Sequence, residues 1–151
     1  MKFLRIMGIV LLLVFVGIQF VPTNRNTSDY IPKSDFTEVF EVPENINTIL
    51  QTSCYDCHSN NTSYPWYNKI QPFNWYLNDH IEKGKEELNF SEFGEYSSRR
   101  QRSKLRSVSS QVEDGEMPLY SYTLIHWDAK LSAKEKEAFI TWIDSLAMEV
   151  R

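Results

Sequence analysis

Two cysteines, the only ones in this chain of 151 residues, stand three positions apart and are followed at once by a histidine. The string is Cys54-Tyr55-Asp56-Cys57-His58, a C-x-x-C-H pattern. The two intervening residues let both sulfurs meet the edge of one porphyrin, and the next residue then turns beneath its face. Because the thiols can add to the two vinyl groups of haem while the imidazole reaches the iron, the pattern predicts one covalently attached c-type haem.

Three other uses of these side chains compete with haem attachment. A thioredoxin-like redox pair is normally embedded in a β-α-β unit, and no such pattern surrounds Cys54 and Cys57. A zinc site needs four ligands, and the remaining histidines, His80 and His126, do not supply the usual paired spacing. A disulfide between residues so near in sequence would close a small loop and stabilise little. Haem attachment is therefore the favoured interpretation.

A sixth ligand to the iron has three candidates downstream, Met117, His126 and His80. Met117 precedes Pro118 in a polar loop ahead of the last helical segment, so its thioether can be held against the haem face opposite His58. Such a ligand favours reduced iron and raises the reduction potential. We therefore expect Met117 as the distal ligand. The two histidines or an open position are the alternatives, and core packing is the alternative role for the methionine.

The amino terminus carries sixteen residues without a charge, Ile6 to Val21, preceded by Lys2 and Arg5. We expect residues 1–22 to form a transmembrane helix, because the run approaches the roughly 30 Å hydrocarbon core and lacks a small-residue cleavage site. A cleaved signal peptide is the alternative. Positive charge before the run and none directly after it predicts a single-pass inner-membrane protein whose domain faces the periplasm.

Beyond this segment the sequence predicts a linker at residues 23–42 and one domain at residues 43–151. The linker is rich in Pro, Asn, Ser and Thr and shows little periodicity. In the domain, apolar residues recur every three to four positions, whereas no run alternating with period two is long enough to build a sheet. The fold class is therefore all-α. The expected helices lie at about 43–50, 73–88, 97–112 and 132–146.

Two local signals refine these helices. Ser132 and Glu135 form a capping-box pattern at the start of the last helix. Gly84 weakens the middle of the helix at 73–88, because glycine loses more backbone freedom than other residues when it becomes helical.

Charge and composition exclude some classes of function. The formal net charge is −4, and the basic cluster from Arg99 to Arg106 lies among Ser and Gln and precedes acidic residues, so nucleic acid is not an expected partner. No Ser-His-Asp, paired-carboxylate or phosphate-loop arrangement stands out, which favours a non-enzymatic role. The aromatic share of 14% suits a small domain that wraps a flat apolar group, and suits an ordinary small core equally well.

The order of these features resembles class I cytochromes c. A helix precedes C-x-x-C-H, Met-Pro follows in a late loop, and Leu-Ser-x-x-Glu leads into a last helix with an aromatic-Ile pair. The string Ser63-Tyr64-Pro65-Trp66-Tyr67 and the segment 84–91 look like the bacterial haem-binding domain family, typically short membrane-anchored monohaem proteins. The resemblance covers about residues 42–146. The insert at 59–111 departs from compact class I cytochromes.

This resemblance implies a cytochrome c-like helical domain around one haem, in which the first and last helices cross near the cofactor. It implies Cys54 and Cys57 as attachment residues, His58 as the proximal ligand and Met117 as the distal ligand. Candidates for contact with the haem propionates rest on chemical grounds alone and comprise Trp66, Trp75, Arg99 and Arg100.

Two strong protein ligands would leave the iron no open position, so we expect outer-sphere electron transfer with an unidentified redox partner protein. The acidic surface would steer the domain toward a basic partner. The alternative is a haem-based sensor, or a ligand-binding or peroxidase-like domain, in which Met117 is displaced. The spin state and carbon monoxide reactivity of the iron distinguish the two.

Overall fold

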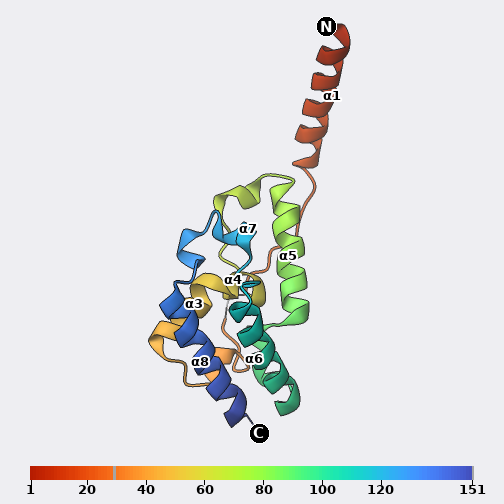
Figure 1. Ribbon diagram of the computed structural model, residues 1–151. Helices are drawn as coiled ribbons and strands as arrows, with labels where there is room; N and C mark the ends of the chain where they lie inside the picture. Colours follow the sequence, from red (N-terminus) through yellow and green to blue (C-terminus); the bar gives the residue numbers. More distant parts are fainter. Residues whose placement is uncertain (29, 151) are drawn as a thin grey trace.

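The computed structural model describes residues 1–28 and 30–150, in which helices and connecting loops occur and no strand is present (Figure 1). The all-α prediction is thus confirmed for the described residues. The longer helices are α1 (Lys2–Ile18), α3 (Glu44–Ser53), α5 (Phe73–Glu87), α6 (Ser98–Glu113) and α8 (Ala133–Glu149). The shorter ones are α2 (Phe36–Val39), α4 (Tyr55–His58) and α7 (Tyr120–Thr123), with the 3₁₀ turns η1 (Trp66–Lys69), η2 (Phe90–Glu95) and η3 (Trp127–Ala129).

The expected helices at 43–50, 73–88, 97–112 and 132–146 correspond to α3, α5, α6 and α8. At the start of α8 the Ser132 hydroxyl accepts a hydrogen bond from the Glu135 amide, and the Glu135 carboxylate accepts one from the Ser132 amide at 2.8 Å. This capping box satisfies two amides that an uncapped helix would leave unpaired.

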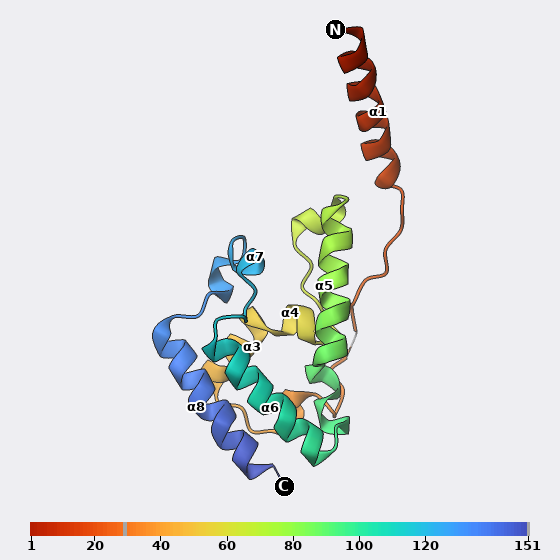
Figure 2. The same cartoon turned by 45° about the vertical axis from the view of Figure 1, so that its right-hand side comes forward.

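The hydrophobic core lies where α6 and α8 pack side by side, with α2 and η2 against them (Figure 2). Phe36 of α2 is fully buried, and its ring lies 5.0 Å from that of Phe93 and 5.3 Å from that of Phe90. These edge-on contacts add to the burial of three aromatic side chains. Residues 23–42, expected from their composition to be a linker, thus contribute a central core residue.

The prediction of a transmembrane helix at residues 1–22 is wrong. Among the described residues, none of the helices has the length and apolar character needed to cross a membrane. The helix that forms there, α1, has 17 residues, about 26 Å at 1.5 Å per residue, which is short of a hydrocarbon core of roughly 30 Å. The single-pass inner-membrane location was derived from that prediction and is therefore not supported either.

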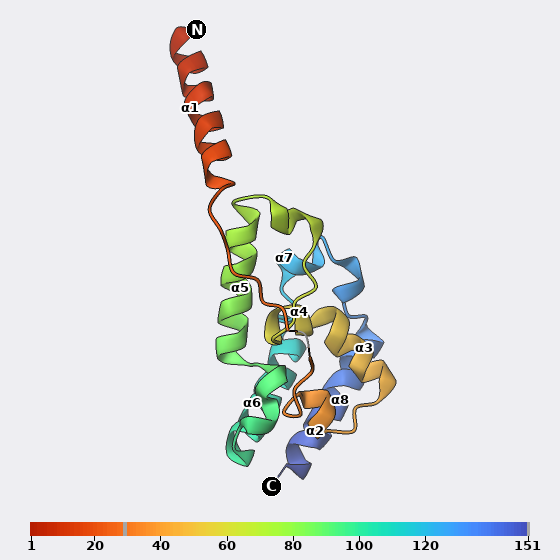
Figure 3. The ribbon, with the colours of Figure 1, turned by 180° about the vertical axis from the view of Figure 1, so that it is seen from behind.

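Asn26 fastens the segment after α1 to the loop that follows the C-x-x-C-H motif. Its side-chain amide donates to the Ser59 carbonyl at 2.8 Å and to the Thr62 hydroxyl at 2.9 Å. Its backbone amide donates to the Tyr64 hydroxyl at 2.7 Å, and its carbonyl accepts from the Thr62 amide at 2.9 Å. Figure 3 shows this segment running along α5, where the Lys85 ammonium donates to the Asn26 side-chain oxygen.

We expect Asn26→Ala to lower the free energy of unfolding by about 1–3 kcal/mol, because it leaves partly buried donors and acceptors without partners. Chemical denaturation of the purified protein measures this change. Asn24→Ala, at an exposed neighbour, is the control and should change stability little. Equal stabilities of the two variants would contradict the role of Asn26.

Candidate functional site

The C-x-x-C-H motif forms one helical turn at the end of α3. The backbone of Cys54 leaves the helix (φ −128°, ψ −47°), and its carbonyl accepts from the amides of Cys57 at 3.2 Å and His58 at 3.0 Å. Residues three apart on a helical turn lie on the same face. Both thiols are therefore presented to one side, with the imidazole directly after them.

Tyr55 anchors this turn to the core. Its ring stacks on Phe90, with centroids 5.2 Å apart and planes 4° from parallel, and its hydroxyl donates to the Asp35 carboxylate at 2.8 Å. Asp35 is buried and also accepts from the amide and hydroxyl of Thr37. Burial, followed by the charge of Asp35, raises the pKa of Tyr55, so the phenol remains a neutral donor.

His58 has the protonation state that an iron ligand requires. Its Nδ1 lies 3.0 Å from the Leu88 carbonyl, and because a carbonyl only accepts, Nδ1 carries the proton and donates. Nε2 then keeps its lone pair for a metal. Burial lowers the pKa of His58, which favours the neutral imidazole.

Gly84 lets α5 approach α4 closely enough to set this geometry. A Cβ atom at position 84 would lie 2.8 Å from the Cys57 carbonyl oxygen and 3.4 Å from the Cys57 Cβ. Any other residue would force the two helices apart. Since Leu88 follows one turn later and carries the carbonyl that binds His58, the packing of Gly84 also positions the imidazole.

Gly84→Ala is expected to destabilise the protein by about 1–3 kcal/mol, because the added methyl meets backbone atoms that cannot rotate away. Thermal unfolding followed by circular dichroism measures the change. Gly17→Ala is the matched control, because a Cβ at that helical glycine would meet nothing within 4 Å. Without the clash, the Gly84→Ala substitution would be expected to stabilise α5 through the helix propensity of alanine, so a rise in melting temperature would refute the assignment.

Two adjoining cavities bring the four predicted cofactor-binding residues together. Their volumes are about 220 Å³ and about 270 Å³, and both are lined by His58 and Met117. Cys57 lines the smaller cavity and Cys54 the larger. The structure therefore places both thiols, the imidazole and the thioether in the walls of two adjoining cavities.

A third cavity, of about 760 Å³, extends this space away from Cys57. It shares Cys57, His80, Leu119 and Tyr122 with the smaller cavity. Its other walls are mainly apolar and comprise Trp66, Tyr67, Ile70, Pro72, Phe73, Tyr76, Leu77, Ser121 and Ile125. Aromatic and aliphatic walls around a space of this size fit a large flat apolar group such as a porphyrin.

The competing uses of the cysteines fit this geometry less well. Both thiols are free, and burial raises the pKa of Cys54 to about 12 and that of Cys57 to about 11. A reactive redox pair needs a lowered thiol pKa instead. Within residues 1–28 and 30–150, no three His, Cys, Asp or Glu side chains cluster as a metal ion would require.

In haem-free protein we expect Cys57 to react with iodoacetamide at pH 8 about 100-fold more slowly than in urea. The reason is that its raised pKa leaves little thiolate, and Cys54 should react more slowly still. Mass spectrometry of timed samples measures both rates. Rates equal to those of the unfolded chain would show that the thiols are not sheltered.

The two alternative distal histidines lie in different surroundings. His126 Nε2 hydrogen-bonds the Tyr67 hydroxyl at 2.9 Å, and its ring stacks on Tyr122 at 4.3 Å, so His126 is engaged outside the walls of the three cavities. His80 Nδ1 bonds the Tyr76 carbonyl at 2.8 Å, and the residue lines two of the cavities beside Cys57. Of the two histidines, His80 is the one next to the candidate site.

Most of the candidates for contact with the haem propionates lie outside the walls of the three cavities. Trp66 lines the largest cavity, whereas Trp75, Arg99 and Arg100 line none of the three, and the Arg100 guanidinium lies over the Tyr96 ring at 3.9 Å.

Two basic residues of the cavity walls, Lys83 and Lys104, were not predicted from the sequence. They pair with Asp79 at 2.7 Å and with Glu87 at 3.5 Å. No motif in the sequence marks either lysine as part of the site.

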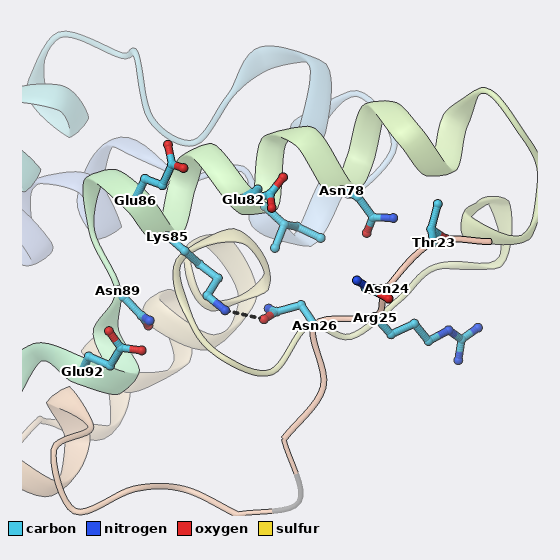
Figure 4. Close-up of a pocket in the computed structure, with 11 residues that line it drawn as sticks. Thr23, Asn24, Arg25, Asn26, Asn78, Glu82, Lys85, Glu86, Asn89 and Glu92 are labelled. Carbon is cyan, nitrogen blue, oxygen red and sulfur yellow. Dashed lines mark hydrogen bonds between the residues drawn. The ribbon is translucent and has the colours of Figure 1, made fainter. Parts of the chain in front are cut away.

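A further cavity, of about 570 Å³, lies on the other side of α5 and has a different character (Figure 4). Asparagines and charged side chains dominate its walls, and Lys85 reaches Asn26 across it. None of the cysteine, histidine or methionine residues of the motif region lines it. This cavity belongs to the attachment of the amino-terminal segment rather than to the candidate site around Cys57.

Comparison with known families agrees with the site. Residues 13–145 match the haem-binding domain family, and the chain belongs to this family. Haem is thereby supported as its ligand. Neither the curated proteins nor the solved structures contain a significant match.

Proposed function

We propose that this protein carries one haem bound covalently through Cys54 and Cys57, with His58 and Met117 as iron ligands, and that it transfers single electrons. The observation that supports this proposal is the pair of adjoining cavities, each lined by His58, Met117 and one of the two cysteines. When bound, the haem supplies reversible one-electron chemistry at its iron.

The side chains around the site suit an electron carrier. The Leu88 carbonyl holds His58 in one orientation through Nδ1, so the imidazole needs no rearrangement when the charge of a bound metal changes. Met117 is half-buried and packs against the hydrophobic core, which limits the contact of its thioether with water. The net charge of −4 favours a partner with a basic contact surface.

Met117→Ala should abolish the weak near-infrared band that methionine-to-iron coordination produces in oxidised protein, and should lower the reduction potential. Absorption spectra and a redox titration of the haem-loaded protein measure both. Met148→Ala, at a residue that is 77% exposed on α8, is the matched control.

Haem that stays with the chain after acid-acetone extraction would demonstrate covalent attachment, and Cys54→Ser with Cys57→Ser should release it. A band that survives Met117→Ala would exclude Met117 as the ligand and direct attention to His80.

A second candidate function is binding of a small ligand at the iron, as in a sensor or a weak peroxidase. The 760 Å³ cavity favours it, because any part of this space that the porphyrin leaves open adjoins the smaller cavity, which His58 and Met117 line, and would admit a diatomic or peroxide ligand. Carbon monoxide that binds reduced wild-type protein readily would support this function over electron transfer.

A further inference from the structure

Met117 packs against the hydrophobic core, but hydrophobic burial contributes little to holding the rest of its segment. This segment, residues 117–126, includes the short helix α7, in which no residue is buried. Tyr120 is 77% exposed and Ile125 is 62% exposed. Within the part of the chain that the structure describes, the helical element with the most contact to α7 is η3, a few residues further along. Polar contacts must therefore contribute much of the attachment of this segment to the domain.

The shortest of the side-chain contacts joins Tyr122 to Asp56, which lies between the two cysteines of the motif. The Tyr122 hydroxyl donates to Asp56 Oδ2 at 2.7 Å, and the Ser63 amide donates to Asp56 Oδ1 at 2.9 Å. The Ser63 backbone amide thus holds one carboxylate oxygen of Asp56, and the other oxygen faces Tyr122 of α7. Hydrogen bonds to an ionised acceptor are about twice as strong as neutral ones.

A second contact supports the same segment. The Tyr67 hydroxyl of η1 hydrogen-bonds His126 Nε2 at 2.9 Å. The rings of His126 and Tyr122 stack with their planes 12° apart, which links the second contact to the first. Tyr122 also shares the wall of the 220 Å³ cavity with Met117, Cys57 and His58.

We propose that the Asp56–Tyr122 hydrogen bond is a latch that holds the Met117 segment across the haem face and sets how readily Met117 leaves the iron. The inference rests on the proposed function, because it takes Met117 as the distal ligand. Asp56 and Tyr122 are positioning residues. They act by joining the motif that binds one face of the cofactor to the segment that covers the other.

The test is the competition between Met117 and imidazole for the oxidised iron of haem-loaded protein. Tyr122→Phe removes only the donor oxygen, and we expect the apparent affinity for imidazole to rise about tenfold, since loss of this bond makes release of the segment easier. The near-infrared methionine band should weaken in parallel. Tyr120→Phe is the matched control at an exposed tyrosine of the same helix, and it should behave as wild type.

Two further measurements separate the latch from a general loss of structure. Amide hydrogen exchange over residues 119–126 should accelerate in Tyr122→Phe while exchange in α6 and α8 stays unchanged. Asp56→Asn weakens the same bond from the acceptor side, and should raise imidazole affinity by a smaller factor, about threefold. The Asp56→Asn variant provides the same test if the Tyr122→Phe protein cannot be produced in folded form.

The outcomes distinguish the latch from the function on which it rests. Wild-type protein without the methionine band, and with high-spin iron, would overturn the distal assignment and the latch with it. Wild-type protein with the band, but with Tyr122→Phe unchanged in imidazole affinity and in exchange, would overturn the latch alone. Equal effects of Tyr122→Phe and Tyr120→Phe would do the same.

Discussion

The close approach of α5 to the C-x-x-C-H turn is the constraint on which the site depends. At Gly84 there is no room for a Cβ atom, since it would lie 2.8 Å from the Cys57 carbonyl oxygen. That contact brings the Leu88 carbonyl within 3.0 Å of His58 Nδ1, and the bond fixes which nitrogen keeps its lone pair. The absence of a side chain at Gly84 therefore helps to determine the tautomer of His58, the proposed iron ligand, because it lets the Leu88 carbonyl reach Nδ1.

The two sides of the proposed cofactor space are held by different forces. The proximal side is part of the core: Tyr55 stacks on Phe90, which packs against the buried Phe36. On the distal side Met117 packs against the core, whereas the partly exposed residues after it depend mainly on hydrogen bonds. Hydrogen bonds between neutral or singly charged partners contribute less than the burial of several aromatic rings. The attachment side is thus expected to be the more rigid, and the Met117 side the one that opens.

The sequence predicted the longer helices of the domain because each depends on local spacing. Ser132 with Glu135, and Ile46, Ile49 and Leu50, are signals contained within one or two turns. It did not predict the burial of Phe36, the Asn26 contacts or the pairing of Asp56 with Tyr122, since each joins segments far apart in the chain. From the sequence Gly84 was expected only to weaken its helix. Its role in letting α5 approach Cys57 depends on a contact between segments far apart in the chain. The transmembrane prediction failed on length, as 17 helical residues do not span the core of a bilayer.

The two positions that the C-x-x-C-H pattern leaves unspecified both make side-chain hydrogen bonds in this fold. Tyr55 points its hydroxyl to Asp35, and Asp56 divides its two oxygens between Ser63 and Tyr122. Neither residue would take part in the proposed thioether chemistry. Grafting the pattern with other residues at these positions would therefore transfer the attachment chemistry while losing the mechanical connection between the two walls of the site. In this chain the two variable positions of the motif, Tyr55 and Asp56, join the motif to the core and to α7.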